Sequence, residues 1–168
     1  MEELLELRGY IEQQNYTEAL DLIGEMEDMS RKSILRNIRA YLVRLLVHLI
    51  KNQVEQRLTN SWAASIRGSV LEIRDLNLKG NHKSYYIKTD DWQYLLEESF
   101  EDAVYEASGE VLSGKHTPLE LIEQVDYHYL YKKAQIMLSD TYHYNRRELS
   151  VRINAYLATL PDGERFKI

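Results

Sequence analysis

The chain has 168 residues, enough for one domain with a sizeable core, and its formal net charge is −6. An acidic chain is a poor match for proteins that coat nucleic acids or bind anionic membrane surfaces. It contains no cysteine, which excludes disulfides, thiolate metal sites and thiol nucleophiles.

The first ten residues, MEELLELRGY, are acidic and amphipathic, and they lack the basic region and cleavage site of a signal peptide. The longest apolar run, residues 42–50, is interrupted by Arg44 and His48. It is also far shorter than the roughly 20 residues needed to span a bilayer. We therefore expect a cytoplasmic protein that does not enter the membrane.

Helical periodicity runs through nearly the whole chain, with none of the two-residue alternation typical of strands. The first short helix uses Leu4, Leu7 and Ile11. A second is expected to begin after Asn15, and Ser30 is expected to cap a third, the long helix that runs to about residue 58.

The later helices have clear start signals. Asn60 or Ser61 opens one helix, and after a polar loop at residues 79–89 Asp90 starts another. Thr117 precedes a proline and a capping glutamate, and two more apolar stripes follow at residues 127–138 and 149–160. These patterns predict an all-α fold: a single compact bundle of about six to eight helices, forming one domain over residues 1–168.

Charge changes sign in blocks along the chain. Residues 1–29 hold nine acidic and one basic residue, whereas residues 30–88 hold twelve basic and three acidic. Such blocks usually mean that helices of opposite sign lie side by side. The functional alternative is a basic face that meets an acidic partner, built from Arg31, Lys32, Arg36 and Arg39.

A narrow polar stripe crosses the otherwise apolar helix at residues 41–55. Its members share one side because their spacing matches the helical repeat: Arg44, His48, Lys51 and Glu55. The stripe is either a solvated seam or a polar cluster held inside the bundle.

If that helix is central, Arg44 and Lys51 need carboxylate partners, because an unpaired buried charge is very costly. Glu25 and Glu27, on the preceding acidic segment, are the natural candidates. A carboxylate beside His48 would raise the imidazole pKa and allow acid–base chemistry. The alternative, a structural hydrogen-bonded network, is favoured.

Two Tyr-His-Tyr motifs precede pairs of cations. Tyr127-His128-Tyr129 comes before Lys132 and Lys133, and residues 142–144 come before two arginines. Aromatics interleaved with cations can stack bases and hold phosphates, so nucleic-acid binding is an alternative function. The sequence has no zinc-protease motif, no di-iron helix pattern and no glycine-rich phosphate loop.

Three segments, LDLIGEMEDMSR (residues 20–31), LLVHLIKNQ (45–53) and SWAASIR (61–67), follow one another as in the domain of unknown function 29 family, which the chain resembles. The segments FEDAVYEA and TPLELIEQV match more loosely. The resemblance implies an all-helical bacterial protein with a family-like core at residues 20–125 and a helical extension at residues 126–168. It implies no established activity.

The resemblance singles out Glu25, Glu27, His48, Lys51, Trp62 and Arg67. The chain departs from the family pattern in two places: Gly24 stands where the first of two paired glutamates usually lies, and Asn52 replaces a tryptophan.

These observations favour a protein-interaction or regulatory module, for example an antitoxin-like partner of another protein, over an enzyme. The candidate binding residues are Arg44, Lys51, Trp62 and Arg67. The alternative is a hydrolytic enzyme with His48, Glu25 and Glu27 as its catalytic candidates. We expect no metal and no cofactor.

Overall fold

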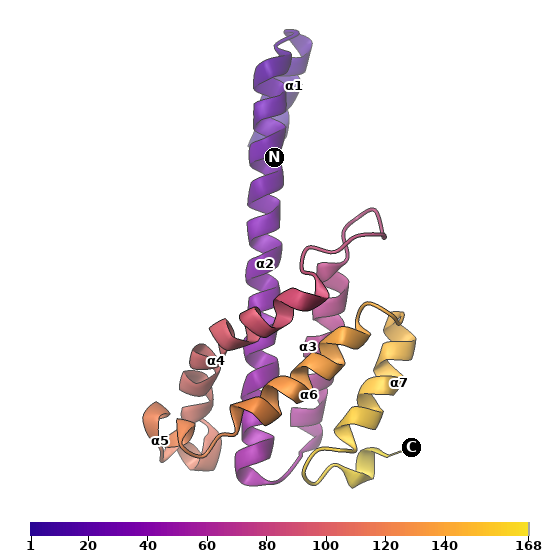
Figure 1. Ribbon diagram of the computed structural model, residues 1–168. Coiled ribbons are helices and arrows are strands. Elements are labelled where there is room, and N and C mark those ends of the chain that lie inside the picture. The colour runs from indigo at the N-terminus through magenta and orange to yellow at the C-terminus, as the bar shows by residue number, and fades with distance from the viewer. Residues whose placement is uncertain (168) are drawn as a thin grey trace. The chain divides into compact units, whose positions relative to one another are not determined.

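A computed structural model of the chain describes residues 1–167, and in those residues seven α-helices follow one another without a β-strand (Figure 1). The all-α prediction is confirmed, and the number of helices lies within the predicted range. The α-helices are α1 (Glu2–Glu12), α2 (Tyr16–Glu55), α3 (Asn60–Asn77), α4 (Trp92–Ser108), α5 (Pro118–Ile122), α6 (Tyr127–Asp140) and α7 (Arg146–Leu157). Three short 3₁₀ helices are η1 (Thr89–Asp91), η2 (Val111–Gly114) and η3 (Glu164–Phe166).

The prediction of a helix boundary at Ser30 is wrong. The second and third predicted helices form one 40-residue helix, α2, and Ser30 lies in its interior. No proline and no left-handed C-capping residue occurs between residues 16 and 55, so nothing in the sequence forces the helix to stop. A serine caps a helix only where the backbone before it can adopt a non-helical conformation.

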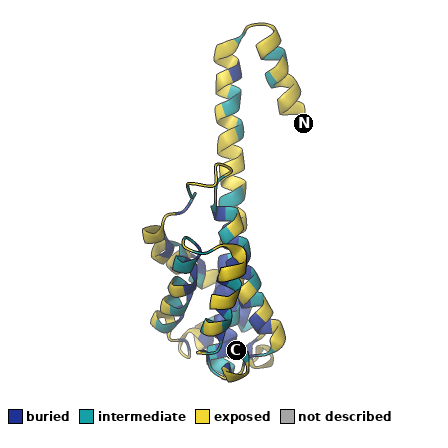
Figure 2. Ribbon diagram, turned by 90° about the vertical axis from the view of Figure 1, so that its right-hand side faces the viewer, coloured by how far each residue is buried: buried dark blue, intermediate teal, exposed yellow. Residues whose placement is uncertain are grey.

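The chain divides into two compact units, Met1–Asn37 and Ile38–Ile168. We call the first the hairpin unit, because α1 and the first part of α2 run side by side in it (Figure 2). Gln14, with a φ of 58°, forms the turn between them, and the Asn15 N–H donates to the Tyr10 carbonyl. We call the second the core unit, and each unit is described by itself.

The core unit contains the hydrophobic core. The second half of α2 supplies a run of fully buried apolar side chains: Leu42, Leu45, Leu46, Leu49 and Ile50 are all at most 1% exposed. Helices α3, α4, α6 and α7 each bury one apolar stripe, with members such as Ile66, Val70, Leu96, Leu130, Leu138, Leu149 and Ile153. The stripes predicted from periodicity therefore form most of the buried faces of these helices, although Tyr127, expected on the stripe of α6, is 47% exposed.

Side-chain caps start several helices where the sequence indicates them. The Thr117 hydroxyl accepts from the Glu120 N–H, with proline at the first helical position of α5, as predicted. Thr59 caps α3, which begins at Asn60. Asn145 and Glu148 form a capping box on α7 that the sequence analysis missed.

A buried polar network fixes the loop between α3 and α4. The Asn77 amide donates to the Ile87 carbonyl at 3.0 Å and accepts from the Ile87 N–H at 2.7 Å. The Tyr142 hydroxyl donates to the same carbonyl and accepts from the Trp92 indole, both at 2.7 Å. Burial raises the pKa of Tyr142 to about 12, so this hydroxyl keeps its proton and remains a donor.

The segment after α7 is tied to the α2–α3 connection. The buried Asn52 amide donates to the carbonyls of Arg57 (3.0 Å) and Pro161 (2.9 Å). Asp162 accepts from the Leu58 N–H, and Arg165 donates to the Leu58 carbonyl. A polar Asn52 thus joins two carbonyls that a tryptophan, the residue common in the resembled family, could not join in the same way.

Within residues 1–167, none of the helices has the length and apolar character that crossing a membrane requires.

Replacing Asn77 with alanine should lower the free energy of unfolding by about 2–3 kcal/mol, because it leaves the buried Ile87 N–H without an acceptor. Chemical denaturation followed by circular dichroism measures this loss. The exposed Asn60→Ala is the matched control and should change stability by less than about 0.5 kcal/mol. Equal effects at the two positions would contradict a structural role for the network.

Candidate functional site

The polar stripe on α2 lies in the core unit and is neither sealed nor fully solvated. Arg44 is exposed, His48 is partly exposed, and Lys51 is only 9% exposed. The Glu55 side chain is 14% exposed. The stripe therefore follows the boundary between the buried face of α2 and solvent.

Lys51 and Trp62 form the centre of this region. The Lys51 ammonium lies 4.8 Å from the centroid of the Trp62 ring, and the Arg57 guanidinium lies 4.6 Å from it. Both cations are thus within the range of cation–π attraction to one indole, which is itself only 8% exposed. Lys51 Nζ also forms an ion pair with Glu110 Oε2 at 3.4 Å.

A second carboxylate balances the second cation. Glu55 Oε1 accepts from Arg57 Nε at 3.1 Å, and Glu55 Oε2 lies 3.5 Å from the backbone nitrogen of Leu112. We call Lys51, Glu55, Arg57, Trp62 and Glu110 the Trp62 cluster. Its two cations and two carboxylates compensate one another, so the cluster joins the end of α2, the start of α3 and the turn after α4.

That turn has an unusual backbone. Leu112, Ser113 and Gly114 have φ angles of 49°, 62° and 71°, one after another. Left-handed conformations cost an ordinary residue about 1–2 kcal/mol, and only the third position is a glycine. A side chain at Gly114 would also place its Cβ 3.0 Å from the Gly109 carbonyl oxygen. Three consecutive left-handed residues thus lie beside the Trp62 cluster, and strained backbone often occurs at functional positions.

A surface pocket of about 460 Å³ opens between the cluster and this turn. Its lining mixes charges of both signs and a histidine: Glu55, Arg57, Glu110, Leu112, Ser113, Lys115 and His116. His116 is held by Glu120 at 3.3 Å, one turn further along the chain. Mixed charge of this kind suits a polar or zwitterionic group better than a simple anion or cation.

His48 is not part of the lining of that pocket. Its Nδ1 lies 2.8 Å from the Arg44 carbonyl oxygen, so a backbone group orients the ring. Burial lowers the pKa of His48 below its ordinary 6.5; nearby Lys51 and Arg44 lower it further, and the bond to the carbonyl and the charge of Glu110 oppose the shift. His48 is therefore neutral at neutral pH.

Glu25 and Glu27 are not the carboxylate partners of the stripe, and that prediction is wrong. Lys51 pairs with Glu110, and Arg44 donates to the Ser65 hydroxyl at 3.3 Å. The two glutamates belong to the hairpin unit and are exposed. The prediction depended on a helix boundary at Ser30 that would have let the acidic segment fold back on the stripe.

Of the other predicted residues, Trp62 and Lys51 come together, whereas Arg67 lies elsewhere. Arg67 donates through Nε and Nη2 to the Ser150 hydroxyl, at 3.0 and 2.7 Å, and so joins α3 to α7.

Glu110, Arg57 and the left-handed turn are parts of the site that were not predicted from the sequence. Arg57 follows Glu55 by two residues, a spacing that gives no helical signal. The glycines at positions 109 and 114 indicate a turn, but not which carboxylate it presents.

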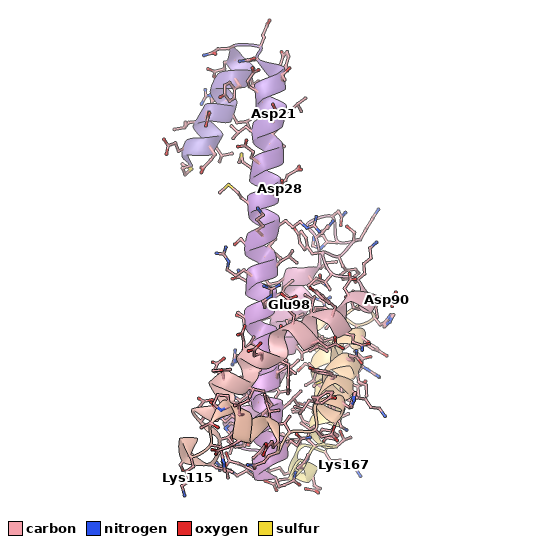
Figure 3. The ribbon with its side chains drawn as sticks, turned by 60° about the vertical axis from the view of Figure 1, so that its left-hand side comes forward. Asp21, Asp28, Asp90, Glu98, Lys115 and Lys167 are labelled. Carbon is pink, nitrogen blue, oxygen red and sulfur yellow. The ribbon has the colours of Figure 1, made fainter. Side chains whose placement is uncertain are left out.

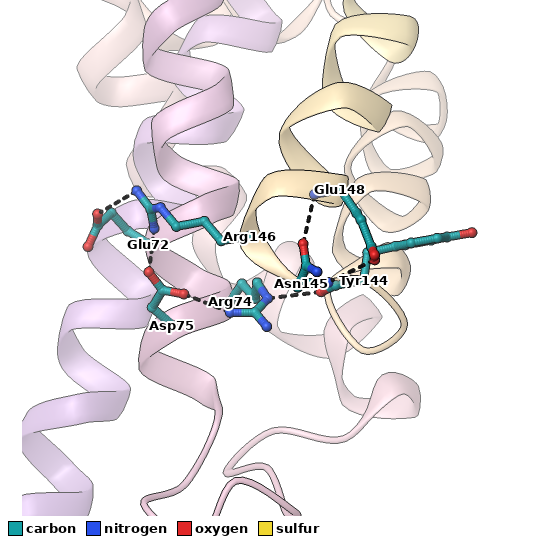
Figure 4. Close-up of polar contacts among 7 residues, drawn as sticks. All are labelled: Glu72, Arg74, Asp75, Tyr144, Asn145, Arg146 and Glu148. Atoms are coloured by element: carbon teal, nitrogen blue, oxygen red, sulfur yellow. Dashed lines mark hydrogen bonds and ion pairs between the residues drawn. The ribbon is translucent and has the colours of Figure 1, made fainter.

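The second Tyr-His-Tyr motif and Arg146, one of the two arginines that follow it, make contacts within the chain. Arg146 forms ion pairs with Asp75 and with Glu72, the latter at 3.7 Å (Figure 4). Arg74 donates to the Tyr144 carbonyl at 3.0 Å and to Asp75 at 3.0 Å (Figure 4). These contacts compete with phosphate binding by the same groups.

The hairpin unit carries a different kind of candidate surface. Of its residues 1–37, all of which the structure describes, only Ala19 is buried (Figure 2). Large apolar side chains are exposed instead on both helices: Leu4, Leu5, Ile11, Tyr16, Leu20 and Met29 are between 50% and 68% exposed. Exposed apolar surface of this extent is typical of an interaction site.

Within residues 1–167, no group of three His, Asp or Glu side chains is arranged so that it could hold a metal ion.

A family model described as "Domain of unknown function DUF29" matches residues 10–130, a range that crosses from the hairpin unit into the core unit. No match was found among curated proteins or among solved structures.

Replacing Trp62 with alanine should cost about 3–5 kcal/mol of unfolding free energy, because it removes a buried ring that two cations share. Tyr94→Ala is the control, since Tyr94 is 68% exposed. Equilibrium denaturation measures both, and a loss below about 1 kcal/mol at Trp62 would contradict its structural role.

Because the pKa of His48 is lowered in the folded chain, the free energy of unfolding should decrease in acid. Below pH 6.5 the unfolded chain binds a proton at His48 more readily than the folded chain does, so stability falls as pH drops through that value. In His48→Asn, whose amide can still donate to the Arg44 carbonyl, this part of the pH dependence should vanish. Proton NMR titration of His48 checks the cause, and a pKa at or above 6.5 would contradict it.

Proposed function

The chain belongs to the DUF29 family, whose description assigns no activity, and from its geometry we propose that it is a protein-interaction module that acts in the cytoplasm. One observation carries the proposal: the hairpin unit exposes apolar side chains on both of its helices and buries only Ala19 among residues 1–37. A free helical hairpin of this length gains little stability from its own contacts. A partner that covers it would bury that surface and stabilise it.

A regulatory role follows from the same surface. A segment with few buried contacts changes its order at small energetic cost, so a partner that binds it can act as a switch. We propose that the module regulates its partner, in the manner of an antitoxin-like protein, through the hairpin unit.

The geometry supports interaction better than hydrolysis. A hydrolytic His48 would need a carboxylate on its ring or a cavity before it, whereas its Nδ1 faces the Arg44 carbonyl. The carboxylates nearest the stripe, Glu55 and Glu110, already face Arg57 and Lys51. We therefore propose that the stripe, together with the Trp62 cluster, is a structural network.

Nucleic-acid binding is also less well supported. Arg146 faces Asp75 and Glu72, and Arg152 forms an ion pair with Asp140 at 2.8 Å, so these cations are already neutralised. Binding of a phosphate backbone needs cations that are free to release counterions.

Substitution of the hairpin surface should abolish partner binding. The full chain, tagged and recovered from an extract of its own cells, is expected to retain a stoichiometric partner. The variant Leu5→Glu/Leu20→Glu should retain at least about tenfold less of the partner. Binding would remove two carboxylates from water and place them in an apolar contact, which costs free energy.

Leu119→Glu is the matched control, because Leu119 in α5 is 77% exposed and lies in the core unit. It should leave partner recovery unchanged. The proposal is contradicted if the full chain retains no stoichiometric partner, or if the hairpin variant and the control behave alike.

A further inference from the structure

The charges on the exposed face of α2 change sign at one point. Four acidic residues occupy one helical face, at positions 18, 21, 25 and 28, and basic residues continue the same face at positions 32, 36 and 39. All seven are exposed, and Figure 3 shows Asp21 and Asp28 on this helix.

The acidic and basic positions mirror each other. The centre of symmetry is the midpoint between Asp28 and Met29. Asp21 precedes this midpoint by the same distance in sequence by which Arg36 follows it, and the same holds for Glu25 and Lys32. Two copies of α2 that run antiparallel about this midpoint would therefore place Glu18, Asp21 and Glu25 opposite bases, whereas Asp28 would stand opposite Met29. In a parallel pair, acids would face acids and bases would face bases.

The hairpin unit also has a small groove whose mainly acidic lining suits basic side chains. It has a volume of about 190 Å³ and lies between α1 and α2, lined by Glu6, Tyr10, Glu18, Asp21, Leu22 and Glu25. Four of these six side chains are carboxylates, and the Tyr10 hydroxyl already donates to Glu6 at 2.9 Å. Leu22 supplies an apolar contact among them.

Resting on the proposed interaction function, we propose that the partner of the hairpin unit is a second copy of this chain, whose residues Lys32 and Arg36 lie antiparallel along the acidic groove. Two-fold symmetry uses the interface twice, so Asp21–Arg36 and Glu25–Lys32 pairs form in both directions. Met29, which is 63% exposed, lies beside the two-fold axis and meets its own copy there.

The next mirrored pair is not part of the proposal. Arg39 stands opposite Glu18 in the same register, but it already forms an ion pair with Glu98 at 2.9 Å.

An interface of exposed ion pairs is weak and sensitive to salt. Each such pair contributes little alone, and added salt screens it. The dimer should therefore weaken as the salt concentration rises.

Sedimentation equilibrium of the full chain tests the proposal. We expect a dimer at low salt that dissociates at high salt. Lys32→Glu/Arg36→Glu and Asp21→Lys/Glu25→Lys should each raise the dissociation constant by at least about tenfold, because attraction becomes repulsion at four contacts. The variant with all four substitutions should restore dimerisation, since every pair is then reversed.

The matched control is Lys83→Glu/Lys132→Glu, which changes net charge by as much as Lys32→Glu/Arg36→Glu but at exposed positions in the core unit. It should dimerise like the unmodified chain. Circular dichroism shows whether each variant keeps its helices.

A second measurement does not depend on charge reversal. The chain has no cysteine, so Met29→Cys introduces a single thiol beside the axis. Mild oxidation should link two chains at this position, whereas Leu119→Cys should give no specific dimer.

A monomer at every salt and chain concentration would overturn self-association, as would a dimer that the charge reversals leave unchanged and Met29→Cys does not cross-link. If the chain is a monomer but Leu5→Glu/Leu20→Glu still loses a captured protein, the hairpin unit serves a different partner. If the chain is a monomer and Leu5→Glu/Leu20→Glu loses no captured protein, the proposed function fails as well.

Discussion

The core unit depends on one constraint, the burial of the second half of α2. Residues 42–50 present apolar side chains on most sides of the helix, and those side chains can leave water only if other helices surround them. Helices α3, α4, α6 and α7 each contribute a single buried apolar stripe to the same unit.

The polar stripe exists where this burial is incomplete. Lys51 keeps only 9% of its surface exposed, and its charge is accommodated by the Trp62 ring and by Glu110. A buried lysine without such partners would be very costly. The strained turn at residues 112–114 closely follows Glu110, the carboxylate that pairs with Lys51.

The sequence predicted the fold class and most helix starts because periodicity and capping residues act locally. Thr117 and the apolar stripe of α4 are examples, and both are found where they were expected. The family resemblance singled out Lys51 and Trp62, which lie together, but it also singled out Arg67, which contacts Ser150 instead. The sequence did not identify Glu110 as the partner, because 59 residues separate Glu110 from Lys51 and no local pattern connects them.

The failure at Ser30 has the same origin. Whether a serine caps a helix or lies inside one depends on whether the chain can turn there, and the residues around Ser30 give no turn signal. The same boundary led to the choice of carboxylate partners, because a turn at Ser30 would have let Glu25 and Glu27 approach the stripe. The prediction of one domain over residues 1–168, with a core at 20–125 and an extension after it, stays a prediction.

The continuity of α2 also changes what its charge blocks mean. If acidic and basic blocks were on separate helices, they could neutralise each other by packing side by side within the chain. On one continuous helix they cannot, because residues 21 and 36 are about 22 Å apart along the axis. Their opposite charges can then be satisfied only by solvent, by other segments or by another molecule. An antiparallel second copy satisfies both blocks at once, and for this reason an uninterrupted helix with mirrored charges favours self-association over a purely internal balance of charge.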